Sequence, residues 1–180
     1  CVKGSVDMTV FETIVVAFSM FSAVPMPQIQ WNERNMRYAM CAFPLIGVLI
    51  GGVLWLWVWL CGLIGFPAVL RGAGLCLIPV VMTGGIHLDG YADTQDALSS
   101  HQSPEKKLEI LKDPHMGAFA AMKLCMYFIL SFALWTSLKD YPGLLVLLAL
   151  CLSRCMSGLA VATFPLSKNT GLAHTFSTDR

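Results

Sequence analysis

The feature that most constrains this chain is an uncharged apolar stretch that runs from Ala39 to Cys61. A helix of about 23 residues rises roughly 34 Å, which is enough to cross the roughly 30 Å hydrocarbon core of a bilayer. Three tryptophans lie near one end of the stretch, where a membrane interface favours them: Trp55, Trp57 and Trp59. Gly47 and Gly51 are one turn apart and would let a second helix approach closely. The stretch therefore predicts a membrane-spanning helix.

Four further segments are apolar: 10–24, 72–85, 118–138 and 143–164. The segment 72–85 needs the residues before it to complete a span, and 10–24 is short, so it is predicted to be an interfacial or re-entrant helix or a marginal span. Charged residues make up 13% of the chain, about half the usual quarter. We therefore predict an all-α, polytopic membrane bundle in a single domain, 1–180, with an acidic loop or helix between the second and third spans.

The net charge of the chain bears on its partners, and the distribution of its basic residues bears on its orientation in a membrane. A net charge of +1 gives no basic field for nucleic acid, so no nucleic-acid partner is expected. If the spans alternate in direction, seven basic residues fall in the segments 25–38, 86–117 and 166–180, whereas the opposite side holds only Lys139. The positive-inside rule therefore predicts that the 86–117 segment is cytoplasmic.

The acidic residues are concentrated in that segment, where six of the eleven lie between positions 89 and 113. In the string GGIHLDGYADTQDAL, Asp89, Asp93 and Asp96 would share one face of a helix. Like charges at this spacing repel each other, and a bound cation would remove that repulsion. Oxygen-only ligands favour Mg²⁺ or Mn²⁺. The alternative is a solvated acidic face, which is less favoured directly after a membrane span.

Five other residues are candidates for the same chemistry. Gly85 would let a phosphate approach the backbone closely. His87 is a base, a phosphate hydrogen-bond donor or a structural histidine, and Asp113 is a base, a fourth ligand or a plain helix cap. Lys112 binds phosphate or is an ordinary solvated charge. Arg154 lies near the middle of its span, where an ionisable group indicates function, paired either with a substrate phosphate or with a carboxylate.

Several strings resemble one known family. GGIHLDGYADTQDAL followed by ILKDPHMGAFA closely resembles the signature of the cobalamin synthase family, the adenosylcobinamide-GDP ribazoletransferases. FSMFSAVPMP, FPLIGVLIG, LSR at 152–154 and GLAHTF resemble other parts of that family. Two departures stand out. Ala23 occupies a position where the family often has Arg or Lys, and family members continue with further apolar helices. We therefore expect a C-terminally truncated domain.

The resemblance implies a Mg²⁺-dependent phosphotransferase late in cobalamin (vitamin B12) biosynthesis. Such an enzyme joins adenosylcobinamide-GDP to α-ribazole or its 5′-phosphate, releases GMP and gives adenosylcobalamin or its phosphate. The residues expected to bind the metal are Asp89, Asp93 and Asp96. The expected base is His87 or Asp113. The residues expected to bind substrate are Gly85, Lys112 and Arg154. The expected partners are these substrates and the lipid bilayer of the bacterial inner (plasma) membrane, and a homo-oligomer is left open.

Two other classes of function remain as alternatives. Phospholipid-forming CDP-alcohol phosphotransferases also use Asp-rich membrane helices and Mg²⁺, but there Asp-Gly is followed by Ala-Arg, whereas here Ala92 is followed by Asp93. An ion transporter with an acidic gate would carry its carboxylates within the spans, whereas here they gather between spans. Release of GMP from a nucleotide donor would separate the three classes.

Overall fold

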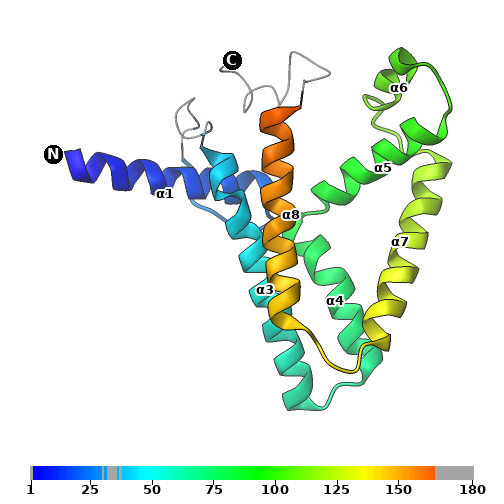
Figure 1. Ribbon diagram of the computed structural model, residues 1–180, viewed down its shortest axis with the longest axis horizontal. Coiled ribbons are helices and arrows are strands. Elements are labelled where there is room, and N and C mark those ends of the chain that lie inside the picture. The colour runs from blue at the N-terminus through cyan, green and yellow to red at the C-terminus, as the bar shows by residue number, and fades with distance from the viewer. Residues whose placement is uncertain (1, 30, 32–35, 37, 165–180) are drawn as a thin grey trace. The chain divides into compact units, whose positions relative to one another are not determined.

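The computed structural model describes residues 2–29, 31, 36 and 38–164, and all regular structure within them is helical (Figure 1). The helices in chain order are α1 (Val2–Phe21), α3 (Ala39–Ile64), α4 (Ala68–Thr83), α5 (Ile86–Ser99), α6 (Pro104–Ile110), α7 (Ala118–Ser137) and α8 (Gly143–Thr163). Three of these, α3, α7 and α8, are long and apolar enough to cross a membrane. The predicted all-α class is confirmed, and the chain is a polytopic helical membrane protein.

The predicted second span is the one that differs most from a simple membrane helix. At 16 residues, α4 is about 24 Å long, shorter than the hydrocarbon core. It qualifies as a span only together with α5, and the two helices are bent by 93°. The bend occurs at Gly84 and Gly85, whose φ angles of 63° and 81° are left-handed. Since other residues rarely adopt this conformation, the glycine pair ends α4 and redirects the chain into α5.

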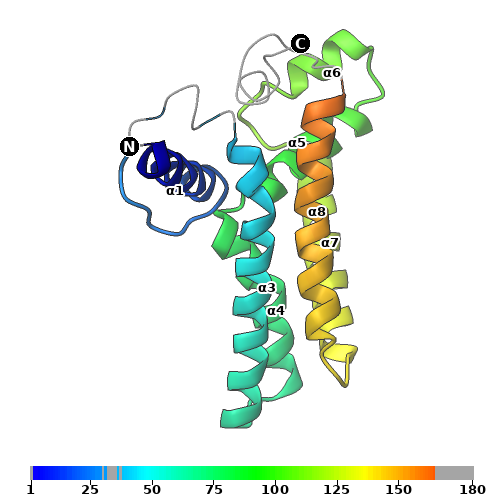
Figure 2. The same ribbon diagram turned by 60° about the vertical axis from the view of Figure 1, so that its left-hand side comes forward.

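The chain divides into two compact units, and the first comprises residues 1–56 and 142–180. In this unit α1 runs crosswise to α3, as the end-on view of α1 in Figure 2 shows. The Phe21 and Phe43 rings meet there with centroids 4.6 Å apart. The buried core of the contact consists of small aliphatic side chains: Val16, Ala17, Ala39 and Ala42. The segment predicted at 10–24 is thus the second half of a helix that ends at Phe21, and its interfacial position stays a prediction.

Helices α3 and α8 approach each other at glycines within the first unit. A Cβ on Gly47 would lie 2.7 Å from the backbone oxygen of Leu150, and one on Gly51 would lie 2.9 Å from Cα of Leu147. Neither distance is tolerated by a real side chain, so the two backbones need glycine at these points. The close helix contact predicted from the Gly47 and Gly51 spacing is therefore present.

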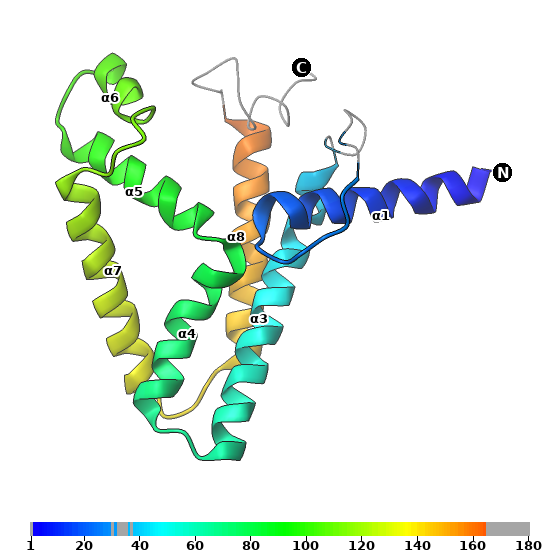
Figure 3. The same cartoon turned by 180° about the vertical axis from the view of Figure 1, so that it is seen from behind.

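The second unit, residues 57–141, is organised around α7. Helix α4 runs antiparallel to α7, and α5 packs against the first half of α7 (Figure 3). The Tyr91 and Tyr127 rings link α5 to α7 at 6.3 Å. At the other end, Nη2 of Arg71 donates a 2.6 Å hydrogen bond to the Leu138 carbonyl, a favourable position for a cation after a helix C-terminus. Helix α7 thus fixes the orientation of α5.

Candidate functional site

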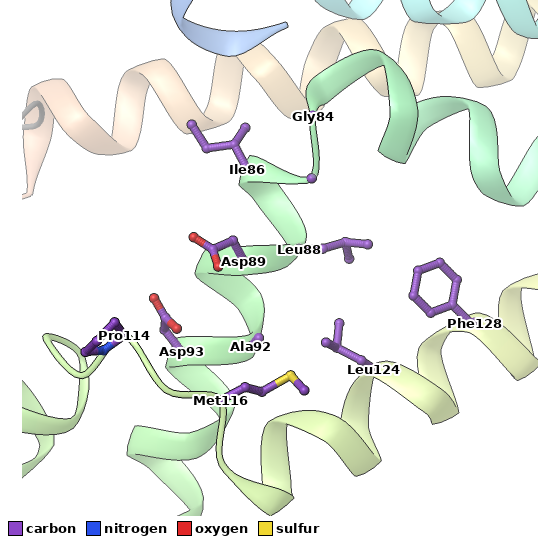
Figure 4. A pocket seen from close by; sticks show the side chains of 11 residues that line it. Gly84, Ile86, Leu88, Asp89, Ala92, Asp93, Pro114, Met116, Leu124 and Phe128 are labelled. Atoms are coloured by element: carbon purple, nitrogen blue, oxygen red, sulfur yellow. The ribbon is translucent and has the colours of Figure 1, made fainter. Parts of the chain in front are cut away.

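A cavity of about 560 Å³ opens in the second unit beside the first turns of α5 (Figure 4). Its volume lies in the range of small-molecule sites, roughly 300–1,000 Å³. One wall comes from the Gly84–Gly85 bend and α5, and another from Leu124 and Phe128 on α7. Pro114 and Met116, in the segment between α6 and α7, complete the lining. The cavity is therefore built by three segments that the 84–128 region folds together.

Two of the predicted acidic residues line this cavity. Asp89 and Asp93 are one turn apart and extend from the same side of α5 (Figure 4). Leu88 projects instead toward Leu124 and Phe128 of α7, so the acidic pair lies on the side of α5 that faces away from these two side chains. Asp89 also lies in the first turn of α5, where the helix dipole stabilises a negative charge.

The third predicted ligand, Asp96, has a different position. Its Oδ2 accepts a 2.6 Å hydrogen bond from the Gly117 N–H, and its Oδ1 accepts a 2.9 Å bond from the Ala120 N–H. Asp96 is not among the residues that line the cavity. Within residues 2–29, 31, 36 and 38–164, no group of three His, Cys, Asp or Glu side chains is arranged to hold a metal ion. Metal ligation by Asp89, Asp93 and Asp96 therefore stays a prediction.

Asp113 lies in the turn that leads from α6 to α7. Its Oδ1 accepts a 2.9 Å hydrogen bond from the His115 N–H and lies 2.7 Å from Nδ1 of the His115 ring. The backbone hydrogen bond, followed by the ring hydrogen bond, lowers the pKa of Asp113, so this carboxylate is ionised at neutral pH. His115 was not among the predicted site residues. The sequence could have indicated this contact, because an Asp side chain commonly accepts a hydrogen bond from the backbone N–H two residues later in the chain.

The remaining predicted residues have separate surroundings. Gly85 lines the cavity, and a Cβ there would meet open space. His87 is half-buried in the first turn of α5, and Lys112 is exposed after α6, and neither is among the cavity-lining residues. Arg154, in the first unit, lies over the Phe43 ring at 5.5 Å, and its buried Nε has no hydrogen-bond partner among the described residues. Substrate contacts of Lys112 and Arg154 stay predictions.

Fold and site together define a polytopic membrane protein with a pair of carboxylates on a helix beside a cavity. Comparison with known families is more specific. The profile of the family described as Cobalamin-5-phosphate synthase matches residues 13–180, and the chain belongs to this family. The resemblance seen in the sequence is therefore confirmed.

Similar curated proteins carry the name adenosylcobinamide-GDP ribazoletransferase. One from Lachnoclostridium phytofermentans is 47% identical over 161 residues, which covers 89% of this chain and 62% of the relative. One from Desulfitobacterium hafniense is 35% identical and covers 89% of this chain and 65% of the relative. One from Clostridium perfringens is 31% identical over 168 residues, which covers 92% of this chain and 67% of the relative. The chain thus spans about 62% of the length of the first of these relatives, and no solved structure matches it.

Proposed function

We propose that this protein acts as an adenosylcobinamide-GDP ribazoletransferase. In this reaction a hydroxyl oxygen of α-ribazole, or of its 5′-phosphate, forms a bond to the phosphorus attached to the cobinamide arm. The bond between that phosphorus and GMP breaks, GMP leaves with the bonding electron pair, and the hydroxyl proton passes to a base. The products are adenosylcobalamin, or its 5′-phosphate, and GMP. Family membership and the names of the relatives support the substrates.

The observation that carries the proposal is the pair Asp89 and Asp93 on the cavity-facing side of α5. Mg²⁺ is commonly bound by one or two carboxylates together with substrate phosphates, and it keeps several waters. Two adjacent carboxylates beside an open cavity fit that requirement. When bound, the ion would neutralise the phosphate oxygens and stabilise the leaving GMP. Asp96, the third predicted ligand, would have to share its oxygens with the Gly117 and Ala120 amides.

Asp113 and His87 remain the proposed bases. Hydrogen bonding from His115 keeps the Asp113 carboxylate ionised, so it can accept a proton at neutral pH. The half-buried His87 imidazole in the first turn of α5 is the alternative base. Lys112 and Arg154 would supply positive charge to the substrate phosphates, with Arg154 suited to a bidentate contact.

We also propose the bacterial inner membrane as the location, with α5 and α6 on the cytoplasmic side. The support is the excess of basic residues on that side of the chain, seven against one. Both proposed substrates are nucleotide-bearing or ribose-bearing molecules, so a cytoplasmic site would meet them directly.

The test is nucleotide release by the protein in membrane vesicles. With adenosylcobinamide-GDP, α-ribazole and Mg²⁺, we expect GMP, and with CDP-diacylglycerol and an alcohol acceptor we expect no CMP. Glu109→Gln removes an exposed carboxylate of α6 that does not line the cavity and should retain activity. CMP release in place of GMP release would assign the protein to the CDP-alcohol class, and absence of both would contradict the proposal.

A further inference from the structure

Asp96 joins α5 to the start of α7 by two hydrogen bonds. Its two oxygens accept hydrogen bonds from Gly117, the residue before α7, and from Ala120 in the first turn of α7. Amides at a helix N-terminus have no partner within their own helix, and they are usually satisfied by a side chain close by in sequence. Here the side chain comes from another helix, 21 and 24 residues earlier in the chain. A carboxylate at this point also complements the dipole of α7.

Gly117 is the matching half of this contact. A Cβ at Gly117 would lie 2.6 Å from Oδ1 and 2.7 Å from Oδ2 of Asp96. The φ angle of Gly117 is −81°, which any residue adopts. The glycine is therefore needed for the close approach of the carboxylate and not for its own backbone conformation. Asp96 and Gly117 thus form a pair in which each residue type depends on the other.

This pair joins the walls of the cavity. Asp93 and Asp89 lie about one and two turns before Asp96 on α5, and Met116 is the residue that precedes Gly117. A bond from Asp96 to the start of α7 therefore holds the acidic pair at a fixed separation from Met116 and from the α7 wall. In Figure 4, Asp89 and Asp93 extend from α5 on the side of Pro114, whereas Leu88 points toward Leu124 and Phe128.

We propose that Asp96 is a positioning residue and not a metal ligand. Through Gly117 and Ala120 it sets the position of the acidic pair on α5 relative to Pro114 and Met116, the lining residues just before α7. The substrate diphosphate binds beside this pair with its cation. This inference rests on the proposed function of the cavity. It assigns different roles to three carboxylates that the sequence places on one face: two bind the cation, and the third fixes the helix that carries them.

The two roles differ in their effect on metal affinity. Removing a ligand weakens the binding of the ion itself, as expected for Asp89→Asn. Breaking the Asp96 contact leaves both ligands in place on the same helix, so affinity for the ion alone should change little, while the geometry for transfer suffers. Misplacing reacting groups by about 1 Å costs up to about 100-fold in rate. Gly117→Ala provides a matched variant, because it breaks the same contact without removing any ligand.

The experiment compares wild type, Asp96→Asn, Gly117→Ala, the double variant and Asp89→Asn in detergent-purified protein. Mn²⁺ binding by electron paramagnetic resonance and hydrogen exchange of the peptide around 114–124 need no turnover, and kcat and KM for GMP release follow. Thr94→Ala is the control, since this exposed side chain donates a hydrogen bond to the Gly90 carbonyl of its own helix.

We expect Mn²⁺ affinity within about twofold of wild type for Asp96→Asn and Gly117→Ala, with faster exchange around 114–124. We expect kcat to fall about 10- to 100-fold in each, and the kcat of the double variant to be no lower than that of either single variant, because both substitutions break the same contact.

Tenfold weaker Mn²⁺ binding in Asp96→Asn, with normal binding in Gly117→Ala, would overturn the inference in favour of ligation. If Asp96→Asn does not fold, Gly117→Ala alone decides, and wild-type exchange and kcat in it would overturn the inference. Unchanged Mn²⁺ binding in Asp89→Asn would instead contradict the proposed function.

Discussion

Replacing Gly47 by alanine tests the closest contact between α3 and α8. The added Cβ would lie 2.7 to 2.8 Å from backbone atoms of Leu150 and Cys151, whereas ordinary contact begins at 3.4 Å. Backbone atoms cannot rotate away as a side chain can, so the two helices must separate by about 0.7 Å. Overpacking of this kind costs about 1–3 kcal/mol. We therefore expect the free energy of unfolding of Gly47→Ala to be lower by about that amount than that of an alanine variant without the close contact.

Gly52→Ala is the matched control on the same helix. Gly52 is exposed, and a Cβ there meets nothing within 4 Å. Both variants gain the helix propensity of alanine, up to about 1 kcal/mol, so the difference between them isolates the contact. The assay is SDS-induced unfolding in detergent micelles, followed by tryptophan fluorescence. Equal unfolding free energies for Gly47→Ala and Gly52→Ala would refute the packing of α3 against α8.

Three further predictions concern the region around the cavity. Gly85→Ala places a side chain at φ 81°, so it should destabilise the α4–α5 bend by about 1–2 kcal/mol in the same unfolding assay, and unchanged stability would contradict the bend. A cysteine at Gln102, in a background without other reactive cysteines, should resist impermeant thiol reagents in intact cells, and rapid labelling would reverse the topology. The hydrogen bonds from His115 lower the pKa of Asp113, so the turn is intact above the ordinary carboxyl pKa and is lost as the pH falls through the lowered value. The His115 amide signal of ¹⁵N-histidine-labelled protein should therefore titrate with a midpoint below about 3.9, and a midpoint above that value would contradict the contact.

The long helices could be predicted from the sequence almost to the residue. The apolar segments predicted at 118–138 and 143–164 are α7, Ala118–Ser137, and α8, Gly143–Thr163. The prediction succeeds because each run carries only one charged residue, Lys123 or Arg154, and is bounded by glycine, proline or charge. The position of Asp89 and Asp93 on one helix face could also be predicted, because it follows from helical periodicity alone and both residues belong to α5.

What the sequence did not reveal depends on contacts between distant segments. The periodicity that joins Asp89 and Asp93 also includes Asp96, and it cannot distinguish a carboxylate at the cavity from one that caps another helix. The partners of Asp96 are backbone amides of Gly117 and Ala120, which have no residue signature. The 93° bend was missed for a related reason, because Gly85 was interpreted only as space for the close approach of a phosphate.

The rate of GMP release as a function of Mg²⁺ concentration tests the central claim most directly. Asp89→Asn and Asp93→Asn each keep the size of the side chain but remove the charge that would hold the ion beside the cavity. At saturating adenosylcobinamide-GDP and α-ribazole, we expect turnover to fall about 100-fold or more in either variant, the cost of losing one preorganised electrostatic group. Glu109→Gln should follow the wild-type curve. Near wild-type turnover at saturating Mg²⁺ in Asp89→Asn or Asp93→Asn would contradict the assignment of this acidic pair.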